Sequence, residues 1–151
     1  MKTNFNVWKT NRNMYLNIIN GLTLEQLNKI PAGFNNNIIW NIGHVIVVQQ
    51  LLTYKATNQN MYVSDELVNL YKTGTRPTND VTQAEVDQLK ALLISNTTQT
   101  ESDYQKGIFT GYNELKLPTG FHIKTIEDAM EFNNYHEGMH LGYIMSIKKF
   151  I

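Results

Sequence analysis

The stretch Tyr135-His136-Glu137-Gly138-Met139-His140-Leu141-Gly142-Tyr143 lies near the C-terminus and holds two of the four histidines of this 151-residue chain. On a helix, residues four positions apart lie on the same face, so the two imidazoles can bind one divalent metal. With Glu137 the string also reads H-E-x-x-H, which in metalloproteases supplies two zinc ligands and a general base. The stretch therefore predicts a helix that carries half of a metal site.

The third ligand of such a protease lies downstream of the motif, but none of the eleven residues after His140 is His, Asp or Glu. The missing ligand must come from upstream, and His44 is the best candidate. Glu137 then lies about 100° around the helix from His136 and about 60° from His140. It either reaches a metal-bound water as a base or is solvated at the surface, and we favour the solvated interpretation.

Apolar residues recur at helical spacing in four segments, which predicts an all-α four-helix bundle. Capping boxes at Thr23 and Thr82 mark helix starts, and a short helix to Ile30 follows the first of them. We expect the long connection after the second helix to hold one or two helical turns at 64–71, and the last loop to hold short extended pieces at 114–117 and 121–123. The four long helices are expected at about 5–20, 37–58, 82–105 and 125–149.

Three histidines occupy core-facing positions on two of these helices. His44 lies in the stripe Trp40, His44, Val47, Val48, Leu51 and Tyr54, whereas the C-terminal stripe runs Ala129, Asn133, His136, His140, Tyr143 and Ile147. A buried neutral imidazole needs partners for both ring nitrogens. Three converging histidines are better explained by a metal, because bundles hold metals between their helices.

The charge balance, the lack of cysteine and the lack of long apolar stretches limit the classes of partner and site that we expect. Thirteen basic and thirteen acidic residues cancel, which gives no reason to expect nucleic acid or an acidic membrane as a partner. The chain has no cysteine, so metal ligands are limited to His, Asp and Glu. No stretch resembles a signal peptide or approaches the 18 or so apolar residues of a membrane helix. We expect one cytoplasmic domain over residues 1–151.

Two motifs resemble those of the DinB/YfiT-like family. Trp40-Asn41-Ile42-Gly43-His44 is similar to its second-helix motif, and the stretch from His136 to Ile144 is similar to its C-terminal motif, usually H-x-x-x-H-x-G-Q-I. The order of elements along the whole chain fits as well, although only the two histidine motifs are specific. The family is similar to bacillithiol- and mycothiol-dependent S-transferases and isomerases.

The resemblance implies an up-down-down-up bundle with a long crossover, often a dimer, in which His44, His136 and His140 hold zinc or nickel with water at the open positions. Tyr143 stands where many members have Gln. It either lines the pocket and donates its hydroxyl, or it is an aromatic core residue. Asn133 is expected to hydrogen-bond a ligand histidine.

Two further residues near these motifs have simpler expected roles. Trp40 lies one helical turn from His44, where it is expected to be a core residue that supports the ligand. His122 lies in the last loop and is expected to be solvated, with a place at the rim of the pocket as the alternative.

Three functions are compatible with these observations. The leading hypothesis is a thiol S-transferase, in which a metal-bound low-molecular-weight thiol attacks an electrophilic small molecule. The second is a metal-dependent hydrolase, with Glu137 or Tyr143 assisting the attack of water. The third is a non-catalytic metal-binding or interaction module. In each case we expect a homodimer, and the two enzyme hypotheses differ in whether turnover needs a thiol.

Overall fold

The computed structural model describes the backbone of residues 2–151 and the side chains from residue 4 onward. Its architecture is all-α, as predicted. The short elements are α2 (Leu24–Asn28), α4 (Asp65–Tyr71), the 3-10 turns η1 (Lys55–Thr57) and η2 (Lys148–Phe150), and strands β1 (Leu115–Lys116) and β2 (His122–Ile123). The long helices are α1 (Lys2–Asn20), α3 (Ile38–Thr53), α5 (Gln83–Gln105) and α6 (Ile126–Ile147).

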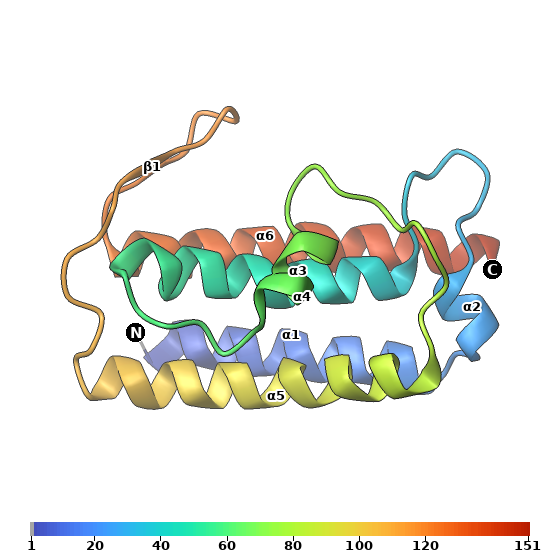
Figure 1. The fold of residues 1–151 in the computed structure, drawn as a ribbon, viewed down its shortest axis with the longest axis horizontal. Helices are drawn as coiled ribbons and strands as arrows, with labels where there is room; N and C mark the ends of the chain where they lie inside the picture. Colours follow the sequence, from blue (N-terminus) through green and yellow to red (C-terminus); the bar gives the residue numbers. More distant parts are fainter. Residues whose placement is uncertain (1) are drawn as a thin grey trace.

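The four long helices form a bundle with up-down-down-up topology (Figure 1). Helices α1 and α6 run in one direction, and α3 and α5 run in the other. Each of α3 and α1 packs against both α5 and α6. The parallel pair α3 and α5 requires a connection that returns along the bundle, and residues 54–82, which include α4, provide it.

Side-chain caps fix the helix starts where the sequence predicted them. Thr23, Thr82 and Thr125 each form a complete capping box, and the side chain of Asn37 accepts a hydrogen bond from the Trp40 backbone N–H. Each such cap stabilises its helix by about 1 kcal/mol. The second long helix was expected to reach residue 58, but it ends at Thr53 and continues only as the turn η1.

Helix α3 differs most from its predicted pattern. An amphipathic stripe was expected, yet every residue from Ile38 to Thr53 except Leu51 is buried. A helix that is buried on all sides, as α3 is, lies at the centre of a fold. The outer side of α3 is covered by α4, and the two helices approach closely at Gly43, where an added Cβ would lie 2.4 Å from the Tyr71 ring.

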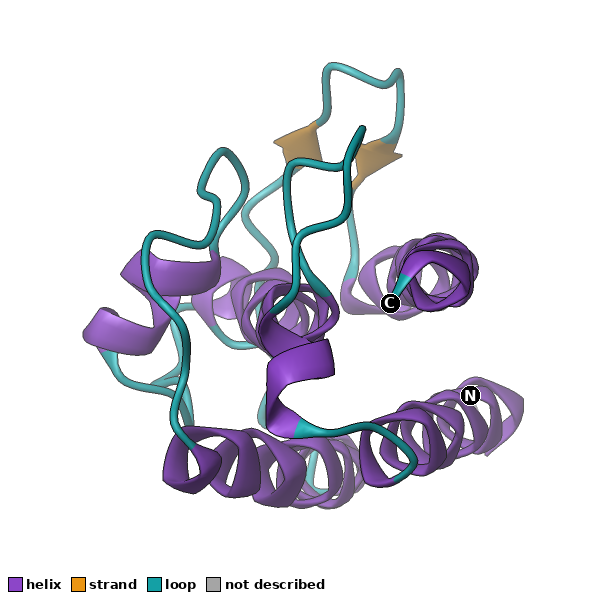
Figure 2. Ribbon diagram, turned by 90° about the vertical axis from the view of Figure 1, so that its right-hand side faces the viewer, coloured by secondary structure: helices purple, strands orange, loops and turns teal. Residues whose placement is uncertain are grey.

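The two short strands form a hairpin that projects from the end of the bundle beside α6 (Figure 2). Both strands lie inside the extended segments that the sequence predicted. The ring of Phe121 packs against Phe132 and Tyr135, which ties the hairpin to α6. Among the described residues, no helix has the length and apolar character that crossing a membrane requires.

Candidate metal centre

The three histidines converge between α3 and α6. One ring nitrogen from each of His44, His136 and His140 lies within 4.8 Å of the other two. His44 and His136 are buried, and His140 is half-buried. The predicted convergence of one upstream and two C-terminal histidines is therefore confirmed, and within the described residues these three form the group suited to hold a metal ion.

Hydrogen bonds through Nδ1 orient the imidazoles of His44 and His140. His44 Nδ1 lies 2.7 Å from the Tyr71 carbonyl, and His140 Nδ1 lies 2.8 Å from Asn41 Oδ1. Both partners only accept, so each Nδ1 carries the proton and each Nε2 presents a lone pair. The Asn41 amide is itself fixed, because its Nδ2 donates to Asn36 and to the Asn37 carbonyl.

His136 completes the donor set. Its Nε2 faces His44 Nε2 at 3.3 Å, and its buried Nδ1 has no hydrogen-bond partner. Two nitrogen lone pairs at this distance need a proton or a cation between them. Tetrahedral zinc with Zn–N bonds of about 2.0–2.1 Å places its ligand nitrogens about 3.3 Å apart. The residues therefore fit a divalent metal, although the binding itself stays a prediction.

Burial keeps the three imidazoles neutral. It lowers the pKa of His136 to about 2, and repulsion from His140 and His44 in their protonated forms, and from Arg12, adds to the effect. Burial, followed by the charge of His44, lowers the pKa of His140 to about 4. The pKa of His44 is also lowered by burial. Because a metal binds the neutral imidazole, protons do not compete for this site near pH 7.

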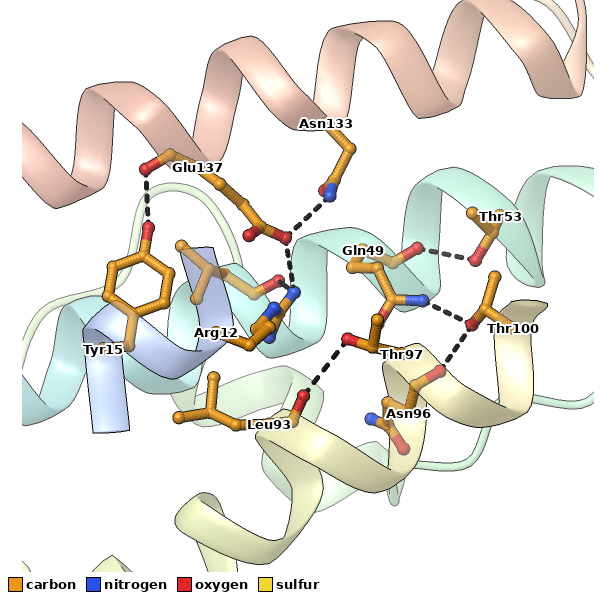
Figure 3. A network of polar contacts seen from close by, with 11 residues as sticks. Arg12, Tyr15, Gln49, Thr53, Leu93, Asn96, Thr97, Thr100, Asn133 and Glu137 are labelled. Carbon is orange, nitrogen blue, oxygen red and sulfur yellow. Dashed lines mark hydrogen bonds and ion pairs between the residues drawn. The ribbon is translucent and has the colours of Figure 1, made fainter. Parts of the chain in front are cut away.

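Glu137 corrects the sequence-based expectation of a solvated side chain. It is fully buried and belongs to a polar network at the centre of the bundle (Figure 3). Its Oε1 accepts hydrogen bonds from Arg12 Nη2 at 2.6 Å and from Asn133 Nδ2 at 2.7 Å. Tyr15 donates its hydroxyl proton to the backbone carbonyl of Glu137. The carboxylate is drawn inward because α1 supplies a buried guanidinium.

Arg12, the buried ion-pair partner of Glu137, was not predicted from the sequence. It continues the apolar series of α1 at helical spacing, between Trp8 and Tyr15, and its side chain is fully buried. A charged residue inside an apolar stripe almost always has a buried partner. That signal was available in the sequence, but nothing in the sequence indicated that the partner would be Glu137.

Asn133 and Trp40 were expected to support the histidines, and only Trp40 contacts one. The Trp40 ring stacks on His44 with centroids 4.8 Å apart, and its indole N–H donates to Thr75. Asn133 was expected to hydrogen-bond a histidine; instead it donates to Glu137. The residues that do bond the histidines, Asn41 and Tyr71, were not predicted.

Tyr143 and His122 lie outside the histidine cluster. Tyr143 is 37% exposed, and its ring packs against Phe34 with centroids 5.4 Å apart. It is therefore neither a core residue nor part of the cavity lining described below. His122 is exposed, as expected, and it pairs across the hairpin with Glu114 at 2.7 Å.

A cavity of about 730 Å³ opens beside the histidines. All three of His44, His136 and His140 line it, whereas Glu137 and Tyr143 do not. The hairpin contributes Leu115 and Leu117 to the wall, so a segment far from both histidine motifs in sequence shapes the site. The centre thus combines three nitrogen donors with a mainly apolar space of small-molecule size.

The model of the DinB superfamily matches residues 8–144, which include both histidine motifs, so the chain belongs to that superfamily. No curated protein matches the sequence.

Proposed function

We propose that the protein is a metal-dependent enzyme that transfers a low-molecular-weight thiol to an electrophilic small molecule. The observation that carries the proposal is the set of three neutral imidazoles at the wall of an apolar cavity, in a chain without cysteine. His44, His136 and His140 would hold the divalent metal, zinc or nickel, which would lower the pKa of a bound thiol and so favour its ionised form at neutral pH. The sulfur comes from the cofactor.

The residues of the chain have three tasks in this scheme. The Tyr71 carbonyl and Asn41 hold two imidazoles in the tautomer that presents Nε2. The apolar walls exclude water, which would compete with the thiol. The cavity orients the electrophile, so that a carbon–sulfur bond forms while the leaving group departs with its electron pair. The thiol proton passes to solvent.

Two observations favour thiol transfer over hydrolysis. None of the described residues that line the cavity is Asp or Glu, so the wall offers no carboxylate base for water. Glu137, the expected base, is engaged with Arg12 and Asn133. A metal-bound water at this site would therefore have to be activated by the metal alone, without a carboxylate to assist its attack.

The test combines purified zinc- or nickel-loaded protein, a panel of low-molecular-weight thiols and the chromogenic electrophile 1-chloro-2,4-dinitrobenzene. We expect a rate above that of the free metal with at least one thiol, and loss of that rate in His140→Ala. Turnover of an ester without any thiol would instead support the hydrolase. A metal-dependent rise in thermal stability with no turnover would support a non-catalytic module.

We also propose that two copies associate through the groove between α1 and α6. Met14, Ile18 and Met145 line this groove, and Met14 and Met145 are both exposed large apolar residues. A formal net charge of zero does not oppose self-association. Light scattering after gel filtration should give the mass of a dimer, and Met145→Asp should give that of a monomer. A monomeric wild type at micromolar concentration would refute this proposal.

A further inference from the structure

The residues that line the cavity extend along α3 away from the histidines. His44, Val48, Leu52 and Lys55 all line it, one turn after another along α3 and into η1. Their spacing along the sequence corresponds to about 16 Å of helix. Lys55 therefore marks the opposite end of the space that begins at His44.

Between these ends the wall is apolar. Seven residues from α3, α6 and the hairpin form it: Val48, Leu51, Leu52, Leu115, Leu117, Pro118 and Phe132. A ligand that fills this stretch buries hydrocarbon, at about 25 cal/mol per Å² of apolar surface removed from water. The body of the ligand is therefore apolar.

The far end is polar and carries a positive charge. Among the described residues that line the cavity, Lys55 is the one Lys or Arg. No carboxylate of the described residues forms an ion pair with it. Asn58 and Asn113 lie at the same end, where Asn113 Nδ2 donates to Asn58 Oδ1 at 3.1 Å. The Asn113 backbone N–H is held by the Ala56 carbonyl at 2.8 Å. This end suits an anionic group.

We propose that the electrophilic substrate is an amphiphile with an apolar body and a carboxylate head. The head meets Lys55, the body lies along Val48 and Leu52, and the opposite end reaches the histidines. This orientation rests on the proposed function for the position of the reacting end. The head-group preference rests only on the cavity itself.

The test uses metal-free protein, so that a carboxylate has no metal to bind. Decanoate, decanol and decylamine share one apolar body and differ in the charge of the head at pH 8. Isothermal titration should rank their affinities as decanoate, then decanol, then decylamine. Lys55→Gln should weaken the binding of decanoate by about threefold to fivefold, the effect of an exposed ion pair, because Lys55 is exposed. It should leave the binding of decanol unchanged.

Lys149→Gln is the matched control, because Lys149 is an exposed lysine in η2 outside the cavity lining. It should leave all three affinities unchanged. Equal affinities of the wild type for the three ligands, no binding of any of them, or a decanoate preference that survives Lys55→Gln would overturn the proposal.

A preference that appears only after zinc loading would place the head at the histidines and overturn the proposed orientation. The absence of thiol turnover would refute the proposed function and leave this metal-free binding result intact, so the two failures can be told apart.

Discussion

The Nε2 atoms of His44 and His136 face each other at 3.3 Å across the interface of α3 and α6. The two residues are 92 positions apart in the sequence. Because His44 lies beside His136, the C-terminal pair of histidines becomes a site with three nitrogen donors.

Gly43 allows α4 to pack closely enough on α3 for Tyr71 to contact His44. An added Cβ would lie 2.4 Å from Tyr71 Cδ1, and the carbonyl of Tyr71 bonds His44 Nδ1. We expect Gly43→Ala to destabilise the fold by about 1–3 kcal/mol through overpacking. Metal affinity should fall as well, because the shifted Tyr71 no longer orients His44. Urea unfolding and a competitive zinc titration measure the two effects.

Gly138→Ala provides the control for that substitution. Gly138 also lies inside a helix, but an added Cβ there meets no atom within 4 Å. Its substitution should stabilise the protein by up to about 1 kcal/mol, because Ala is the better helix former. If both variants lost stability to the same extent, the close approach of Tyr71 would not be the cause at Gly43.

Asn41 is predicted to raise the affinity for the metal through its hydrogen bond to His140. Its Oδ1 accepts the Nδ1 proton at 2.8 Å, and partners of this kind typically contribute 10- to 100-fold to metal affinity. We expect Asn41→Leu to weaken zinc binding by about that factor. Asn35→Ala, at an exposed position just before α3, is the control and should bind zinc normally. An unchanged zinc affinity in Asn41→Leu would remove this residue from the site.

The Arg12–Glu137 pair is predicted to be structural. Both side chains are fully buried, so removal of one partner leaves the charge of the other buried and unpaired. Glu137→Gln and Arg12→Met should each lower the free energy of unfolding by about 3–5 kcal/mol. The double variant Arg12→Met/Glu137→Leu should recover much of that loss. A fully stable Glu137→Gln protein that has lost all turnover would instead make Glu137 a catalytic residue.

The lowered histidine pKa values predict acid sensitivity of the metal-free protein. In the unfolded chain a histidine titrates near pH 6.5, whereas folding lowers the pKa of His140 to about 4 and that of His136 to about 2. Between pH 6.5 and 4 the unfolded state therefore binds protons that the folded state does not. Stability falls in this range with decreasing pH, by about 1.4 kcal/mol per pH unit for each proton.

Thermal melts of metal-free protein at pH 7 and pH 5 measure this effect. His140→Gln should reduce the difference between the two melting temperatures, because one of the protons is no longer involved. Identical pH dependence in the wild type and His140→Gln would contradict the assignment.

Much of the fold was predictable because its signals are local. The capping residues Thr23 and Thr82 act on neighbouring residues, and the structure places helix starts directly after them. The same applies to the i, i+4 spacing of His136 and His140. Even the link to His44 followed from the lack of a ligand downstream.

The errors concern long-range partners. The solvated assignment of Glu137 failed because its orientation depends on Arg12, 125 residues away. Helix α3 was read as amphipathic because periodicity within a helix does not reveal that α4 covers its outer side. Asn133 was assigned to a histidine because it lies one helical turn from His136, but its amide donates instead to the buried carboxylate of Glu137, which lies one turn away on the same helix. Such choices are decided by tertiary packing.

The most direct test of the central claim is the metal content of purified protein, measured by elemental analysis for the wild type, His44→Ala and His122→Ala. The account predicts about one zinc or nickel per chain in the wild type and in His122→Ala, and a large loss in His44→Ala. Equal metal in the wild type and His44→Ala would show that His44 is not a ligand. The three-histidine centre would then be wrong.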